Sequence, residues 1–271
     1  MSVINTNVSA MYSQNAMKTN ARAMSTAMEQ LSTGTRVNAA KDDAAGLAIG
    51  QNMTSQIRGL NMAIRNLNDG INMMQTAEGA MVEQSNMLQR MRELAVQSMN
   101  GTYSSTQRGY LDLEFQALSS QIDDISANTT WNDQVLLDDS VGDFQFQAGQ
   151  SSGQTITVTI ADMGIGTLGV SGTSIDTLDN ATTALTEISS ALETINEQRA
   201  TIGAGINRME YAVDNLANIS SNATQSRSTI MDTDYATATT QLAKTQIIQQ
   251  AATAMLAQAN QQPQAVMQLL K

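Results

Sequence analysis

Histidine and cysteine are absent from this sequence of 271 residues. The chain therefore lacks the commonest general base, the commonest zinc ligands and a thiol nucleophile. Proline occurs once, at Pro263, and aromatic residues make up only 3%. The apolar residues, 41% of the chain, are mainly Ala, Leu, Ile and Met, which favours helices packed on helices. We predict a protein that is not an enzyme, with no catalytic residue, no metal site and no cofactor.

Long hydrophobic runs are also missing. No stretch approaches the roughly 20 apolar residues that a membrane span needs. The first 18 residues lack a basic segment and a continuous apolar run, so we expect no cleaved signal peptide. Such a protein either stays inside the cell or leaves it by a route that needs no such peptide.

Charge is unevenly placed along the chain. The net charge is −11, and residues 109–198 contain 14 acidic residues and no Lys or Arg. This acidic stretch argues against nucleic acid or an anionic membrane as a partner. Residues 1–17 and 245–270, in contrast, carry no charged side chain at all.

Both uncharged ends adjoin or contain apolar residues at alternating steps of three and four, the pattern of a coiled-coil seam. Because neither stripe is broad enough to be buried on all sides, we predict that the two ends pack with each other and with copies of themselves. The predicted packing residues are Met17, Ala21, Met24, Met28, Leu31, Ile248, Ala252, Met255, Ala259, Val266 and Leu269.

Further seams lie between the ends, over residues 57–99, 111–125 and 178–216. In the middle of the chain, Phe144 and Phe146 alternate with Gln, and Ile156 and Val158 alternate with Thr. This alternation predicts a β-hairpin with one buried face. The expected fold is mostly α, a long antiparallel helical bundle or coiled coil with a small β-hairpin region mid-chain.

Several motifs resemble bacterial flagellin. In the first half these are the sequences at 3–7, 31–38, 41–46, 65–70 and 89–97; in the second half they lie at 199–208, 232–236 and 258–263. They occur in order over roughly residues 1–140 and 190–271. The stretch 131–134 lacks an Asn-Gly that relatives often carry, and Ala238 stands where an acidic residue is common.

The resemblance implies an inner D0 domain built from both termini and an outer D1 domain, in a short form without further domains. We expect D0 to comprise residues 1–40 and 231–271, and D1 to comprise residues 41–175, with the hairpin, and 176–230. The implied function is the structural subunit of the extracellular flagellar filament, a helical homopolymer for swimming. An export chaperone, a cap protein and junction proteins are implied partners, and export through the growing filament agrees with the expected lack of a signal peptide.

Flagellins similar to this chain are recognised by the innate receptor TLR5. The matching residues here are Gln89, Arg90, Glu93, Leu94, Gln97 and Glu114. Arg90, Glu93, Leu94 and Gln97 fall at i, i+3, i+4 and i+7, so the spacing predicts one helix stripe. The alternative role for this stripe is packing against a neighbouring subunit, which is the better account of its use in the bacterium.

Two other functions stay open at the level of the sequence. A hook–filament junction protein shares the terminal domains, although the motif at 89–97 and the Ala-rich C-terminal match favour flagellin. A surface adhesin or ligand-binding protein belongs to a different class.

Overall fold

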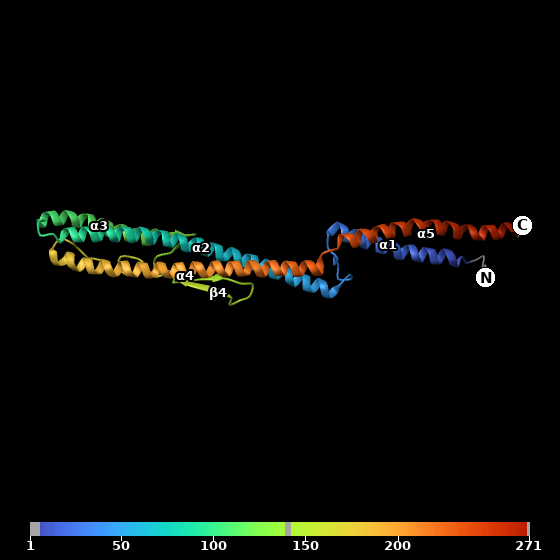
Figure 1. Cartoon of the computed structure of the whole chain (residues 1–271), viewed down its shortest axis with the longest axis horizontal. Coiled ribbons are helices and arrows are strands. Elements are labelled where there is room, and N and C mark those ends of the chain that lie inside the picture. Colours follow the sequence, from blue (N-terminus) through green and yellow to red (C-terminus); the bar gives the residue numbers. More distant parts are fainter. Residues whose placement is uncertain (1–5, 139–141, 270–271) are drawn as a thin grey trace. The chain divides into compact units, whose positions relative to one another are not determined.

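The computed structural model describes residues 6–138 and 142–269, with side chains described as far as residue 261. Its elements confirm the predicted class, mostly α with a small mid-chain hairpin region (Figure 1). They are α1 (Val8–Thr33), α2 (Ala44–Ser98), α3 (Ser105–Asn128), β1 (Thr130–Trp131), β2 (Gln134–Val135), β3 (Asp143–Gln147), β4 (Thr155–Thr159), α4 (Leu178–Met231) and α5 (Tyr235–Leu269). No helix within these described residues is long and apolar enough to cross a membrane.

The chain divides into two compact units. A terminal unit combines Met1–Ile57 with Ser221–Lys271, and a central unit comprises Arg58–Ser220. Both boundaries fall inside helices, within α2 and within α4. The sequence-based boundaries at 40/41 and 230/231 lie instead at the connections between helices, so the terminal unit is longer than the predicted D0 domain.

The core of the central unit is built on seven-residue repeats in α2 and α4. The repeat in α2 places six apolar side chains that are at most 6% exposed: Leu60, Leu67, Met74, Met81, Leu88 and Ala95. The repeat in α4 places six that are at most 7% exposed: Ala181, Ile188, Ile195, Ile202, Met209 and Leu216. A strict seven-residue period keeps one face of each long helix turned toward its partners.

Arg199 is a charged residue in the α4 seam, and it forms an ion pair with Glu78 of α2. The Nη2 atom of Arg199 lies 3.5 Å from Oε1 of Glu78, and both side chains are about one third exposed. The ion pair lets Arg199 stay at the edge of the core without an unpaired charge.

Helix α3 packs on the same core through Phe115 and Ile122, both fully buried. It begins with a capping box, in which Ser104 and Gln107 each accept the other's backbone N–H. The buried amide of Gln84, on α2, donates to the carbonyl oxygens of Ile122 and Met163 at 3.3 and 3.2 Å. Gln84 therefore ties α2 to α3 and to the segment that follows the hairpin.

Strands β3 and β4 form the predicted antiparallel hairpin, with Phe144 opposite Val158 and Phe146 opposite Ile156. Its apolar face lies against helices at positions where they carry glycine. A Cβ atom at Gly70 of α2 would lie 2.8 Å from the ring of Phe146, and one at Gly205 of α4 would lie 3.0 Å from Val158. The two glycines therefore provide the space in which the hairpin packs.

The two connections of the terminal unit pair with each other. The backbone N–H of Thr233 donates to the carbonyl of Gly34 at 3.0 Å, and that of Arg36 donates to Met231 at 2.6 Å. Gly34 ends α1 in the left-handed conformation, with φ 73°. Before α5, the Asp234 carboxylate accepts from the Thr237 hydroxyl and from backbone N–H groups. The hydroxyl bond to Thr237 above all holds the pKa of Asp234 below its usual value.

The glycine at position 70 gives a test of hairpin packing. Gly to Ala in a helix interior normally stabilises by roughly 0.5–1 kcal/mol. Gly70→Ala should instead destabilise the central unit by about 1–3 kcal/mol, because its methyl group meets the Phe146 ring. The matched control is Gly79→Ala in the same helix, where nothing lies within 4 Å and the normal gain is expected. Urea denaturation of both variants measures the change in the free energy of unfolding. An increase for Gly70→Ala would contradict the packing described.

Candidate functional site: assembly and recognition surfaces

Helices α1 and α5 lie side by side within the terminal unit (Figure 1). Their seam consists of half-buried or buried residues at steps of three and four, and many of these are small. On α1 they are Ala10, Ser13, Met17, Asn20, Met24, Ala27 and Leu31; on α5 they are Ala238, Leu242, Thr245, Gln249, Ala252, Leu256 and Ala259. Small seam residues allow the two backbones to approach closely.

The predicted packing residues divide into three groups. Met17, Met24, Leu31, Ala252 and Ala259 lie on this seam. Ala21, Met28, Ile248 and Met255 do not: they are exposed, and Asn20, Ala27, Thr245, Gln249 and Leu256 occupy the seam instead. Val266 and Leu269 lie outside the residues whose side chains are described. The seam within one chain is thus corrected at four positions, while a role for these side chains between subunits stays a prediction.

The physical reason for the correction is a polar contact inside the seam. Nδ2 of Asn20 donates to the carbonyl oxygen of Thr245 at 2.8 Å and to Oε1 of Gln249 at 3.2 Å. Asn20 is 8% exposed and Thr245 is 2% exposed. Polar residues such as Asn20 and Gln249 can occupy a seam when hydrogen bonds satisfy their buried groups, and a pattern of apolar residues alone does not detect them.

Two more hydrogen bonds link α5 to α1 or to its N-cap. Asn7, the N-cap of α1, donates through Nδ2 to the carbonyl of Ala259 at 2.8 Å. The Tyr235 hydroxyl, at the start of α5, donates to the carbonyl of Leu31 at 3.1 Å. Together with the Asn20 contact, they show that the pair is antiparallel over most of the length of α1.

Large apolar side chains remain exposed on the outer faces of this pair. On α1 they are Val8, Met11, Tyr12 and Met28; on α5 they are Ile247, Ile248 and Met255. Their exposed fractions run from 39% for Ile248 to 74% for Tyr12. Exposed apolar patches can mark interaction sites, so these side chains are candidates for contact with other subunits.

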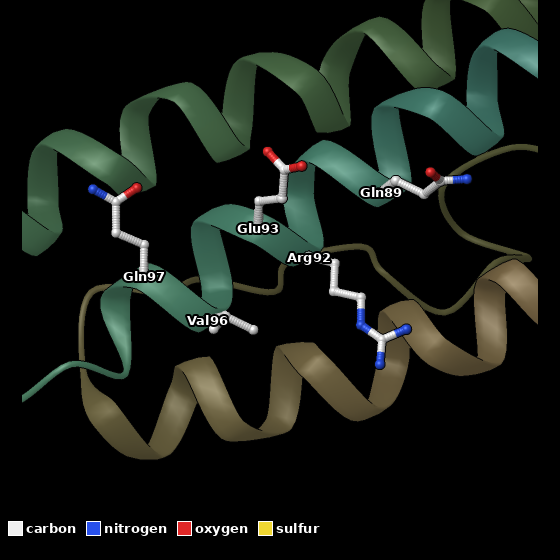
Figure 2. A pocket seen from close by; sticks show the side chains of 5 residues that line it. All are labelled: Gln89, Arg92, Glu93, Val96 and Gln97. Carbon is white, nitrogen blue, oxygen red and sulfur yellow. The ribbon is translucent and has the colours of Figure 1, made fainter.

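A second surface lies on α2 in the central unit. A shallow hollow of about 440 Å³ is lined by Gln89, Arg92, Glu93, Val96 and Gln97. Figure 2 shows that all five labelled side chains come from α2, with the other helices at its sides. Val96, an apolar residue that is 54% exposed, and Arg92 were missed by the motif comparison; their i, i+4 spacing to each other is the signal that could have found them.

Arg90 connects this surface to α3. Its Nη1 lies 2.9 Å from Oε2 of Glu93, and its Nη2 lies 2.9 Å from Oε1 of Glu114. The bonds to Glu93 and then Glu114 raise the pKa of Arg90 and so favour its charged form. Arg90, Glu93 and Glu114, from two helices, thus form one exposed ion-pair group.

Leu94 does not belong to this exposed surface. It is fully buried, whereas Gln89, Arg90, Glu93, Gln97 and Glu114 are exposed. Because α2 is covered by more than one neighbour, it buries a wider stripe than a two-helix seam would, and Leu94 falls within that stripe. The prediction of one surface stripe containing Leu94 is therefore corrected.

Comparison with known proteins accounts for both halves of the chain. Residues 4–141 match the bacterial flagellin N-terminal helical region, and residues 185–270 match the bacterial flagellin C-terminal helical region. The chain belongs to the bacterial flagellin family. This is a family of structural proteins that form the filament of the flagellum, and the chain is a structural filament subunit.

Individual relatives agree with this assignment. Over 271 aligned residues the chain is 45% identical to flagellin of Halalkalibacterium halodurans, covering 99% of this chain and 100% of that protein. It is 40% identical to flagellin of Bacillus subtilis, covering 99% of each. The crystal structure of Bacillus cereus flagellin aligns with a TM-score of 0.52 at 32% identity, over 56% of this chain and 88% of that one. The junction-protein and adhesin alternatives are not favoured.

The burial of Leu94 leads to a direct prediction. Leu94→Ala should destabilise the central unit by about 2–5 kcal/mol, the usual cost of removing a buried Leu side chain. Arg90→Ala should leave the unfolding free energy nearly unchanged, because exposed ion pairs contribute little. Thermal and urea denaturation of the two variants measures the difference. Equal effects from both substitutions would contradict the placement of Leu94 in the core.

Proposed function

We propose that this flagellin polymerises through its terminal unit, whose uncharged helix ends pack with those of neighbouring copies in the filament core. The observation that carries the proposal is the apolar outer surface of the α1–α5 pair, which one chain leaves exposed. A seam of small residues covers only one face of each helix. The remaining apolar side chains need other subunits to remove them from water.

The division of charge between the two units supports the same proposal. The terminal unit contains seven Lys and Arg against five Asp and Glu, and the central unit contains seven against twenty. In a helical polymer every side chain is repeated at each subunit, so one buried charge becomes a column of like charges. Residues 1–17 and 245–270 avoid this penalty because they carry no charged side chain. The acidic central unit fits an outer position, where its charge keeps filaments dispersed.

We further propose that the exposed residues Gln89, Arg90, Glu93, Gln97 and Glu114 form the TLR5-type surface, together with Val96 in place of Leu94. A hollow with a charged rim and an apolar side chain is suited to bind a protruding side chain of another protein. Neighbouring subunits in the filament would use the same surface, so a receptor would meet it only on released monomers. The export chaperone, cap and junction proteins are proposed partners by family resemblance.

Met255 gives a test of core assembly. Its side chain is 63% exposed in the single chain, so Met255→Lys should leave the melting of the subunit unchanged while it prevents filament growth. The reason is that a charge would be repeated along the core of the polymer. Deleting residues 245–271 should also abolish growth. Electron microscopy after addition of filament seeds measures the length and number of filaments.

The matched control adds the same charge to the acidic central unit. Ser190→Lys replaces an exposed side chain on α4 and should assemble like the unchanged protein. Normal filaments from Met255→Lys, or equal failure of both variants, would refute assembly through the uncharged ends.

A further inference from the structure

The seam between α1 and α5 is close to repeating itself, which leaves its register poorly defined by apolar contacts alone. On α5, one row of the seam has Ala at 238, 252 and 259, and the other row has Leu at 242 and 256. Over the described positions from Ala238 to Ala259, the seven-residue repeat is broken only by Thr245 and Gln249. Apart from these two residues, the seam positions of α5 repeat Ala in one row and Leu in the other every seven residues. The apolar residues by themselves therefore do not distinguish registers that are seven residues apart.

Thr245 and Gln249 are the two residues that meet the buried Asn20 of α1. The Asn20 amide donates to the Thr245 carbonyl at 2.8 Å and to the Gln249 side-chain oxygen at 3.2 Å. The Thr245 hydroxyl donates to carbonyls of its own helix, at Gln241 and Leu242, so it is buried with its hydrogen bonds made. Asn20, the buried polar residue of the α1 seam, thus contacts the two polar residues that interrupt the apolar seam of α5.

We infer that Asn20, Thr245 and Gln249 act as a polar layer that fixes the register in which α1 pairs with α5. Shifting α5 by seven residues would bring Asn20 against Ala252 and Leu256, or against Ala238 and Leu242. The side-chain oxygen of Gln249 would be lost, and a Leu would face the buried amide. A buried polar group without its partner costs free energy that an apolar mismatch does not. A polar residue at one seam position is a known way for coiled coils to set register, at some cost in stability.

The other contacts between the helices discriminate less between registers. Asn7 and Tyr235 donate to backbone carbonyls of Ala259 and Leu31, and a helix offers such a carbonyl at every position. The same holds for the Thr245 carbonyl that Asn20 contacts, so the side-chain oxygen of Gln249 is the acceptor that is specific to the register. The paired connections at Gly34 and Thr233 hold one end of the pair, and Gly34 is 14 residues from Asn20 in the sequence. Ion pairs, the usual alternative, do not join the described parts of the two helices: the charged residues there are Lys18, Arg22 and Glu29 on α1 and Lys244 on α5, and none of them forms an ion pair across the seam.

The consequence for assembly rests on the proposed function. When many copies are brought together, the ends of every chain offer the same small and apolar rows. The polar layer makes one pairing better than its shifted versions, so that each subunit enters the filament with its ends in the same register.

The absence of cysteine makes the register measurable by disulfide formation. Ser13 and Ala252 lie on the seam midway between the Asn7–Ala259 and Asn20–Thr245 contacts, so Ser13→Cys with Ala252→Cys reports the native register. Ser13→Cys with Ala259→Cys reports a shift of seven residues. In full-length protein with Asn20, we expect cross-linking of the first pair and almost none of the second.

Replacing Asn20 by Leu should separate register from stability. In Asn20→Leu, disulfide formation by the shifted pair should rise about tenfold or more relative to the native pair, while the melting temperature stays equal or rises. Met17→Leu, an apolar exchange on the same seam, should leave both cross-links as they are. Seeded filaments of Asn20→Leu should be fewer or irregular.

The outcomes are distinct from those of the assembly proposal. If the native pair of Asn20→Leu still cross-links fully and the shifted pair still fails, the connections alone set the register and the inference is wrong. If the unchanged protein forms no filaments, the proposed function fails, but the cross-links still read the register. Melting that falls with no change in cross-linking would assign Asn20 a role in stability only, and would also overturn the inference.

Discussion

Seven-residue spacing of buried side chains along α2 and α4 is the constraint on which the central unit depends. Twelve apolar residues at this interval lie at or near zero exposure, and α3 and the hairpin pack onto the core that they form. Helices of 55 and 54 residues would be unstable alone in water at this composition, so packing of one face is what keeps them folded. Gly70 of α2 and Gly205 of α4 leave space on these helices in which the strands of the hairpin pack.

The terminal unit has the same spacing of seam residues, but these residues are smaller and most of the helix surface stays exposed. Ala, Ser, Thr and Asn fill much of the α1–α5 seam, so two helices can lie close together while most of their circumference stays exposed. In an independent domain this would be a weakness, since little apolar area is buried. In the proposed assembly it leaves apolar surface for the next copy, and we propose that the outer Met, Ile and Tyr side chains, which are exposed in one chain, belong to that surface.

The fold class and the hairpin with its one apolar face follow from periodicity, because period 3.5 and period 2 report directly on which face is buried. The exact seam was harder to predict. Met28 and Met255 have the spacing and hydrophobicity of core residues, yet Ala27 and Leu256 are more buried than they are. The seam contains the polar Asn20 and Gln249 where the prediction had Ala21 and Ile248, so hydrophobicity alone selects the wrong phase of the three-and-four spacing. The prediction that Leu94 lies on the exposed stripe was also wrong, because the spacing of a motif does not show how many neighbours cover a helix.

A conflict between two requirements explains the polar residues of the seam. Helix pairs commonly choose their register and partners with charged residues beside the seam, but a charge near the axis of a polymer is repeated at each subunit. A chain under both requirements can set register with neutral groups whose buried donors are hydrogen-bonded. Asn, Thr and Gln meet that condition, since an amide can donate and accept within one layer and a hydroxyl can bond its own helix. Asn20, Thr245 and Gln249 are neutral groups of this kind: the Asn20 amide donates to Thr245 and Gln249, and the Thr245 hydroxyl donates within its own helix.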